Sequence, residues 1–150
     1  MEQDLVAARI ARILKAIESL IPEYLSDPLD LQIAQGNVAV CIIDAHGTVY
    51  GKMFEGAGDK LRRRESYRVA RVKASQVWIT GIKTFDYERL VFAGQIDAGQ
   101  FGINAPDFIG WEGGQPLSLD SETLISVGFS GFRGTSDLEI VQRALVSAIP

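Results

Sequence analysis

Residues 38–54 place the tightest constraint on what this chain can fold into. An apolar stretch precedes the segment Asp44-Ala-His-Gly47, and a loosely alternating run, Thr48–Phe54, follows it. The first stretch, Val38–Ile43, is apolar throughout and mostly β-branched, which predicts a strand buried on both faces. Asp44 can bond its own backbone and Gly47 accepts a positive φ, as a tight turn requires. The segment therefore predicts a β-hairpin whose second strand ends near Phe54.

Helical periodicity and breaking residues indicate the remaining elements. Pro22 is expected to end the first helix, and Leu29–Ile33 alternates like a short strand. A second hairpin is predicted from Pro116–Leu119 and Leu124–Ser130, after a glycine-rich passage from Ala98 to Pro116. Apolar residues at three- and four-residue spacing predict four helices, over residues 4–21, 60–80, 86–96 and 137–148.

The element order predicts the fold class. Hairpins that are adjacent in sequence favour an antiparallel sheet with helices packed on it, so residues 1–150 are expected to form one α/β (α+β) domain. The helix over residues 60–80 has two apolar sides, with Val72 on one of them. A helix of this kind usually contacts two surfaces, so we expect it to contact its own core and a second subunit.

Composition excludes several classes of protein. The chain of 150 residues has a net charge of −4, which argues against non-specific nucleic-acid binding. Cys41 is the single cysteine, so an intrachain disulfide and a cysteine-based zinc site are excluded, and a small buried hydrophobe is the favoured interpretation. The sequence lacks a signal peptide and a run of membrane-spanning length, which predicts a cytoplasmic protein with no membrane partner.

Four motifs in order resemble the GlcG/HbpS-like family (haem-degrading domain, PduO C-terminal-like). Val-Cys-Ile-Ile-Asp44-Ala-His-Gly47 followed by Lys52-Met53-Phe-Glu55-Gly-Ala57 resembles its strand-turn-strand. The family's Lys-Ala helix is matched by Val69-Ala70 and Lys73-Ala74. Gly113-Gly114-Gln-Pro116 is similar to its Gly-Gly-x-Pro segment, and Ser126–Gly131 followed by Asp137 resembles its last strand and helix start.

The resemblance implies a fold and a ligand class. The family fold is a profilin-like, three-layer α/β/α arrangement with a central antiparallel sheet, here of about five strands. Family members assemble as dimers or larger rings, and several bind haem. Haem or another tetrapyrrole is thus the implied cofactor, on the resemblance alone. The chain departs from the family pattern at Lys52, at the extra Phe54 and at Glu55, so its own specificity is expected in this loop.

Charged residues beside these motifs are candidates for catalysis. Arginine can clamp a carboxylate, and Glu can act as an acid or a base. Lys73 lies beside the core face of its helix, where it can extend to solvent, pair with Asp44 or serve a site. Each residue is more often an ordinary surface charge, and their shared position beside motifs makes them candidates. The catalytic candidates are Glu55, Lys73, Glu112 and Arg133.

A second set of residues is expected to bind a ligand. Phe108 and Trp111 can line a pocket for a flat molecule or cover the core, and the cover is the favoured interpretation. The two glycines before Pro116 are expected to serve backbone geometry rather than a phosphate loop. His46 is the only histidine, and we expect a turn residue rather than a metal ligand. The ligand-binding candidates are Lys52, Met53, Arg68, Phe108, Trp111, Gly113, Gly114 and Ser130.

Three functions remain open from the sequence. The first is binding of a small molecule between the Glu55 loop, the 60–80 helix and the Gly99–Pro116 passage. The second is a cofactor-independent isomerase, tautomerase or hydrolase that acts on a small anionic catabolic intermediate. The third is a structural homo-oligomer without a pocket. The spacing of the residues selects no metal ligand set.

Overall fold

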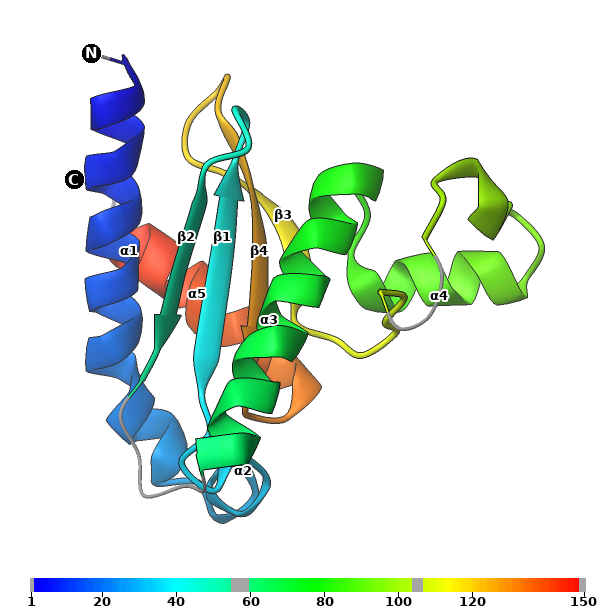
Figure 1. The fold of residues 1–150 in the computed structure, drawn as a ribbon. Coiled ribbons are helices and arrows are strands. Elements are labelled where there is room, and N and C mark those ends of the chain that lie inside the picture. Colours follow the sequence, from blue (N-terminus) through cyan, green and yellow to red (C-terminus); the bar gives the residue numbers. More distant parts are fainter. Residues whose placement is uncertain (1, 55–59, 104–106, 149–150) are drawn as a thin grey trace.

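The computed structural model describes residues 2–54, 60–103 and 107–148, which form a sheet between two helical layers. Figure 1 shows α1 and α5 on one face of the sheet and α3 on the other. The elements are α1 (Glu2–Leu25), α2 (Pro28–Ala34), β1 (Ala39–Asp44), β2 (Val49–Met53), α3 (Lys60–Thr80), α4 (Thr84–Phe92), a 3-10 turn (Ala98–Gln100), β3 (Gly114–Ser118), β4 (Leu124–Ser130) and α5 (Gly134–Ala148).

The sheet is antiparallel and has the order β2-β1-β4-β3. This confirms the expected three-layer α/β/α fold and both hairpins. Four strands form in the described part of the chain, rather than about five. The difference arises at Leu29–Ile33, the expected short strand, which belongs to α2. Asp27 caps this helix by accepting from the Leu29 amide at 2.9 Å, and Pro28 occupies its first turn.

The two faces of the sheet carry different side chains. On β1, Val40 and Ile42 face α1 and α5, whereas Ala39 and Cys41 face α3. Isoleucines on α1 such as Ile13 meet α5 in the larger core, where each fully buried side chain contributes about 1.5–3 kcal/mol. Small residues dominate the α3 side, and α3 therefore lies close to the sheet. Cys41 is buried, as expected for a small hydrophobe, and this burial raises the pKa of its thiol to about 11.

α3 approaches the sheet closely at Gly128 on β4. A Cβ at this position would collide with the backbone of Ala70 and would lie 2.6 Å from the Ala74 amide nitrogen. The neighbours of Gly128 on β4, Val127 and Phe129, point to the opposite face. At this point β4 contacts α3 through its backbone, whereas its large apolar side chains pack in the core on the α1–α5 side. This contact fixes the depth at which α3 side chains meet the sheet.

The first helix continues past Pro22, which we expected to end it. Pro22 lies inside α1, which extends to Leu25. The last turn is held by tertiary contacts: the ring of Tyr24 stacks on Phe132 at 5.5 Å, and its hydroxyl donates to Glu139 at 2.5 Å. Packing therefore outweighs the hydrogen bond that proline cannot make.

Other boundaries differ by a few residues from the sequence expectation. The third helix was expected over 86–96, but α4 spans Thr84–Phe92, and α5 begins at Gly134 rather than at 137. α3 spans residues 60–80 as expected. Helix ends are set by local caps and contacts, which periodicity does not encode. No helix in the described ranges combines the length and apolar character needed to cross a bilayer.

Candidate functional site

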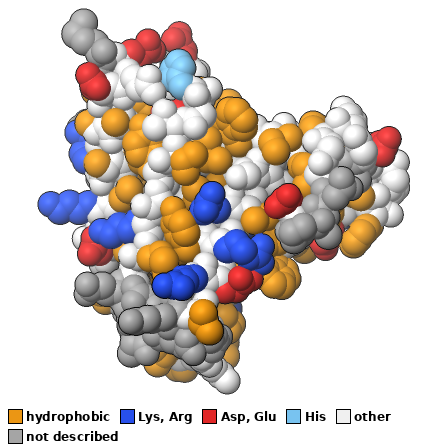
Figure 2. Space-filling view, viewed as in Figure 1, with side chains coloured by type: hydrophobic (Ala, Val, Ile, Leu, Met, Phe, Trp, Pro, Cys, Tyr) orange, Lys and Arg blue, Asp and Glu red, His pale blue; other side chains and the backbone are white. Residues whose placement is uncertain are grey.

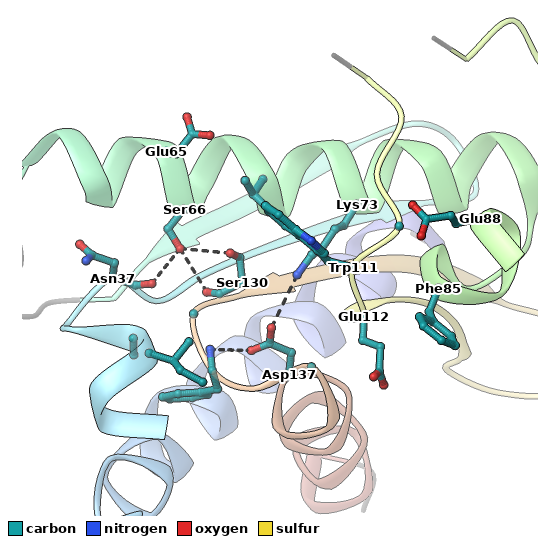
Figure 3. A pocket seen from close by; sticks show the side chains of 17 residues that line it. Asn37, Glu65, Ser66, Lys73, Phe85, Glu88, Trp111, Glu112, Ser130 and Asp137 are labelled. Carbon is teal, nitrogen blue, oxygen red and sulfur yellow. Dashed lines mark hydrogen bonds and ion pairs between the residues drawn. The ribbon is translucent and has the colours of Figure 1, made fainter. Parts of the chain in front are cut away.

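A buried pair of opposite charges lies between α3 and α5. Lys73 Nζ is 3.6 Å from Asp137 Oδ2, and both side chains are almost fully buried. Lys73 also donates to the carbonyl oxygen of Phe129 at 2.8 Å, and the Asp137 carboxylate accepts from the Phe132 amide at 2.8 Å. Figure 3 shows the two side chains pointing toward each other from their helices. The sequence alternative that paired Lys73 with Asp44 is wrong.

Burial brings the pKa values of the two groups together. Desolvation raises the pKa of Asp137 to about 8, although Lys73 and the Phe132 amide oppose the shift. Desolvation lowers the pKa of Lys73, against the attraction of Asp137. The two groups therefore titrate as a coupled pair that shares one proton.

Gly113 closes one side of this pair. Its φ is +121°, and a Cβ there would lie 2.7 Å from Lys73 Nζ. The Gly113 carbonyl accepts from the Phe129 amide at 3.0 Å. Phe129 on β4 is therefore bonded on its amide side by Gly113 and on its carbonyl side by Lys73. Glycine is required here for both the backbone conformation and the space beside the ammonium group.

The charged pair lies at the floor of a cavity of about 630 Å³. α3 contributes Ser66, Val69 and Lys73 to one wall, and α4 and the loop before β3 form another. A cavity of this size with an apolar lining and a few polar groups is typical of small-molecule sites. The other lining residues are Ile33, Ala34, Asn37, Glu65, Phe85, Glu88, Gly110, Trp111, Glu112, Ser130, Gly131, Phe132, Gly134 and Asp137.

Two buried polar side chains hold the loop that carries Trp111. The amide group of Gln76 accepts from the Ile109 amide at 2.9 Å and donates to the Ile109 carbonyl at 2.8 Å. The Thr84 hydroxyl donates to the Trp111 carbonyl at 2.5 Å and accepts from the Gly114 amide at 3.2 Å. Residues from α3 and α4 thus fix the position of Trp111 at the cavity mouth.

A hydroxyl cluster lies at the opposite end of the cavity. Ser66 donates to the carbonyl oxygen of Asn37 at 2.7 Å, and its hydroxyl lies 3.3 Å from that of Ser130. The buried Asn37 Oδ1 has no hydrogen-bond partner within the described part of the chain. The cavity therefore offers polar contacts at this end and on its floor, separated by apolar Val69.

Four of the predicted site residues line the cavity, and two lie beside it. Lys73, Glu112, Trp111 and Ser130 contribute to the lining. Gly113 touches Lys73, and a Cβ on Gly114 would lie 3.0 Å from the Thr84 hydroxyl oxygen and 3.1 Å from Val77. Phe108 instead packs against Tyr87 at 5.5 Å, which agrees with the interpretation of core cover. Glu55 lies outside the described residues, together with the Glu55–Ala57 loop.

The remaining candidates have partners away from the cavity floor. Lys52 pairs with Glu18 at 2.8 Å, and Met53 packs against the small core beneath α3. Arg68 binds both carboxylate oxygens of Glu65. Arg133 binds Asp27 at 2.9 Å and the buried Asp30 at 3.1 Å, so it joins the start of α2 to the loop between β4 and α5 instead of clamping a ligand in the cavity. His46 is exposed in the β1–β2 turn, as expected.

The outer side of α3 carries basic side chains. Arg64, Arg68 and Arg71 are exposed, and Figure 2 shows basic side chains gathered over this helix beside hydrophobic ones. Sequence reasoning missed Ser66, Phe85 and Glu88, which line the cavity, and also Gln76 and Thr84, which hold the Trp111 loop. None belongs to a recognisable motif, and only the close packing of α3 and α4 brings them there.

Comparison with solved structures confirms the fold. A crystal structure described as a PduOC–haem complex is 23% identical, with a TM-score of 0.64, over 93% of this chain and 91% of that one. The Klebsiella pneumoniae protein ORFY, described as DUF336, is 20% identical, with a TM-score of 0.67, over 94% and 88%. This chain has their fold. No family model and no curated protein matches it.

The fold also occurs at lower identity. The protein Ybr137w is 12% identical, with a TM-score of 0.64, over 95% of this chain and 77% of that one. The agreement in fold bears out the architecture that the GlcG/HbpS-like resemblance implied. Because these identities are below 25%, they carry the arrangement of helices and strands and leave the chemistry to the residues of this chain.

Proposed function

We propose that this chain is a GlcG/HbpS-like protein that binds a small, partly apolar molecule in the Lys73 cavity. The observation that carries the proposal is a cavity of about 630 Å³ with a buried charged pair on its floor. Apolar walls provide most of the binding energy in such sites, and a few fixed polar groups orient the ligand. Phe132 and Val69 supply apolar surface, and Ser66 and Lys73 supply fixed donors.

Haem is the ligand implied by the resemblance, and a haem complex is described for PduOC. The described cavity lining fits an iron-ligated haem poorly. It contains no His, Cys, Met or Tyr, and its one amine, Lys73, is held by Asp137 and Phe129. We therefore expect haemin to produce no shifted Soret band through this cavity. A shifted band that Lys73→Met abolishes in a folded variant would contradict this expectation.

Binding can be followed through Trp111, which stands at the cavity mouth. Trp78→Phe leaves Trp111 as the sole tryptophan, because the chain contains two. We expect the neutral probe biphenyl-4-ylmethanol to change Trp111 emission in a saturable way. Ser130→Phe fills the cavity from β4 and should abolish this change, whereas the matched control Ser118→Phe, on an exposed position of β3, should preserve it. Equal binding by both variants, with folding verified by circular dichroism, would refute the proposed site.

A proton-transfer enzyme is a second candidate, favoured by the Lys73–Asp137 geometry. In the neutral form of the pair, the Lys73 amine can remove a proton from the carbon beside a ketone while the Asp137 carboxyl protonates the ketone oxygen. A carbon–hydrogen bond breaks, an enol forms, and the total number of protons is conserved. The reverse transfer returns the ketone.

This candidate predicts deuterium exchange into a simple ketone. The protein in D₂O should accelerate exchange at the α-carbons of 4-phenyl-2-butanone, measured by ¹H NMR. Asp137→Asn and Lys73→Met should each remove the acceleration, because either variant lacks one partner in the transfer. The control Glu122→Gln, in an exposed turn, should exchange at the wild-type rate. Wild-type rates in folded Asp137→Asn protein would refute the acid–base role.

A further inference from the structure

Trp111 presents an uncovered aromatic face at the cavity mouth. Its side chain is 68% exposed, and Phe85, another lining residue, is 50% exposed. The loop that carries Trp111 is nevertheless fixed by Gln76 and Thr84. Exposure of this large apolar surface to water is unfavourable, and a bound group that covered the ring would remove that exposure. Trp111 is therefore preorganised to contact a ligand at the cavity mouth.

Two carboxylate side chains that line the cavity come from segments next to Trp111. Glu112 follows it in the chain and packs over Gly134, where a Cβ would lie 2.7 Å from the Glu112 Cβ. Glu88, on α4, places its carboxylate against Gly110, the residue before Trp111, so closely that a Cβ there would collide with it. Figure 3 shows Phe85 and Glu88 projecting from α4, and Trp111 and Glu112 from the loop.

The charges around the cavity do not balance. The described lining contains four carboxylates and one ammonium group. Asp137 pairs with Lys73, and Glu65 with Arg68. Glu88 and Glu112 form no ion pair with any described residue, although Lys83 lines the adjoining hollow together with Glu112. The cavity lining thus includes Trp111 and two carboxylates that have no ion-pair partner among the described residues.

We propose that the mouth of the Lys73 cavity binds the ammonium group of an organic amine, a specificity that rests on the proposed binding function. A cation over the face of tryptophan gains quadrupole attraction, which is stronger for Trp than for Phe or Tyr. Glu88 and Glu112, which line the same cavity, add Coulombic attraction, and the apolar part of the amine enters the cavity toward Val69. The same charges disfavour the anionic intermediate named among the sequence alternatives.

Three probes of the same shape test the charge preference. Biphenyl-4-ylmethylammonium, biphenyl-4-ylmethanol and biphenyl-4-carboxylate differ at the group that would reach the mouth. Titrated against the Trp78→Phe protein at low salt, the cation should bind about tenfold more tightly than the neutral probe, through cation–π and ionic contacts together. The anion should bind more weakly than the neutral probe. Addition of 0.5 M NaCl should reduce the advantage of the cation.

Charge-removing variants locate the preference. Glu88→Gln and Glu112→Gln should each weaken the cation about threefold to fivefold and leave the neutral probe unchanged. Glu122→Gln changes the net charge by the same amount far from the cavity and should have no effect. Trp111→Leu, followed by calorimetry, should also weaken the cation more than the neutral probe.

The outcomes separate this inference from the proposed function. Equal or tighter binding of the neutral or anionic probe would overturn the amine specificity while leaving the cavity as a binding site. An equal loss of cation affinity in Glu122→Gln would also overturn it, because the effect would then follow from net charge. Absence of binding by all three probes would refute the proposed function itself.

Discussion

Replacement of Asp137 by alanine is expected to lower the free energy of unfolding by about 3–5 kcal/mol at pH 7, the usual cost of removing one partner of a buried ion pair. The change leaves Lys73 without its counter-charge in a site from which water is largely excluded. It also removes the acceptor of the Phe132 amide at the start of α5. Chemical denaturation monitored by circular dichroism measures the loss.

Two further variants isolate the cause of that loss. Lys73→Met combined with Asp137→Leu removes both charges and should recover part of the stability, since an apolar pair avoids the desolvation penalty. Asp86→Ala breaks an exposed ion pair with Arg89 on α4 and should cost less than about 1 kcal/mol. If Asp137→Ala lowered the free energy of unfolding by no more than Asp86→Ala, the stabilising role of the buried Lys73–Asp137 pair would be contradicted.

The pH dependence of stability follows from the coupling of Lys73 and Asp137, because burial raises the pKa of Asp137 and lowers the pKa of Lys73. Near neutral pH the pair holds one proton in the folded state and one in the unfolded state, so it adds little pH dependence to the stability of the wild type. In Asp137→Asn the buried Lys73, with its lowered pKa, releases a proton that the unfolded state retains as pH rises. The stability of this variant relative to the wild type should therefore improve between pH 5 and pH 8, and an unchanged difference would contradict a lowered pKa of Lys73.

Gly128→Val is expected to cost about 3 kcal/mol, the upper end of the range for overpacked cores. The added atoms would meet the backbone of Ala70 and Ala74 on α3, which cannot rotate away. α3 must then lift from the sheet, which should also weaken binding of the biphenyl probes at Lys73.

A matched control separates overpacking from the general effect of valine in a strand. Ser118→Val introduces the same side chain on β3, where the position is exposed, and should change stability by less than about 0.5 kcal/mol. Thermal and chemical unfolding of the two variants should differ strongly. Equal stability of Gly128→Val and the wild type would show that the α3 backbone does not pack directly against β4 at Gly128.

Much of the fold could be predicted from local patterns. The buried run of β1 and the turn at Asp44 and Gly47 predict the first hairpin because both signals act over a few residues. The position of α1 beyond Pro22 could not be predicted, because the stack of Tyr24 on Phe132 depends on a residue more than a hundred positions away. The alternating pattern of Leu29–Ile33 predicted a strand, but the Asp27 cap stabilises a helix there instead.

The candidate site was less accessible to sequence reasoning. Lys73 could be singled out because a lysine beside an apolar helix face is uncommon. Its partner could not be assigned, since Asp44 and Asp137 both adjoin motifs and only the crossing of α3 over β4 decides between them. Glu88 and Thr84 gave no signal, because their roles arise from a loop folding back on α4.

The arrangement of α4 separates stability from recognition. α4 extends away from the sheet in Figure 1, yet α4 and the segment just before β3 supply Phe85, Glu88, Trp111 and Glu112 to the cavity mouth. The sheet and the α1–α5 core contain none of these side chains. Replacement of the exposed side chains Phe85 and Trp111 should therefore cost little stability, and a change of ligand in this scaffold needs no change in the Lys73–Asp137 pair beneath them.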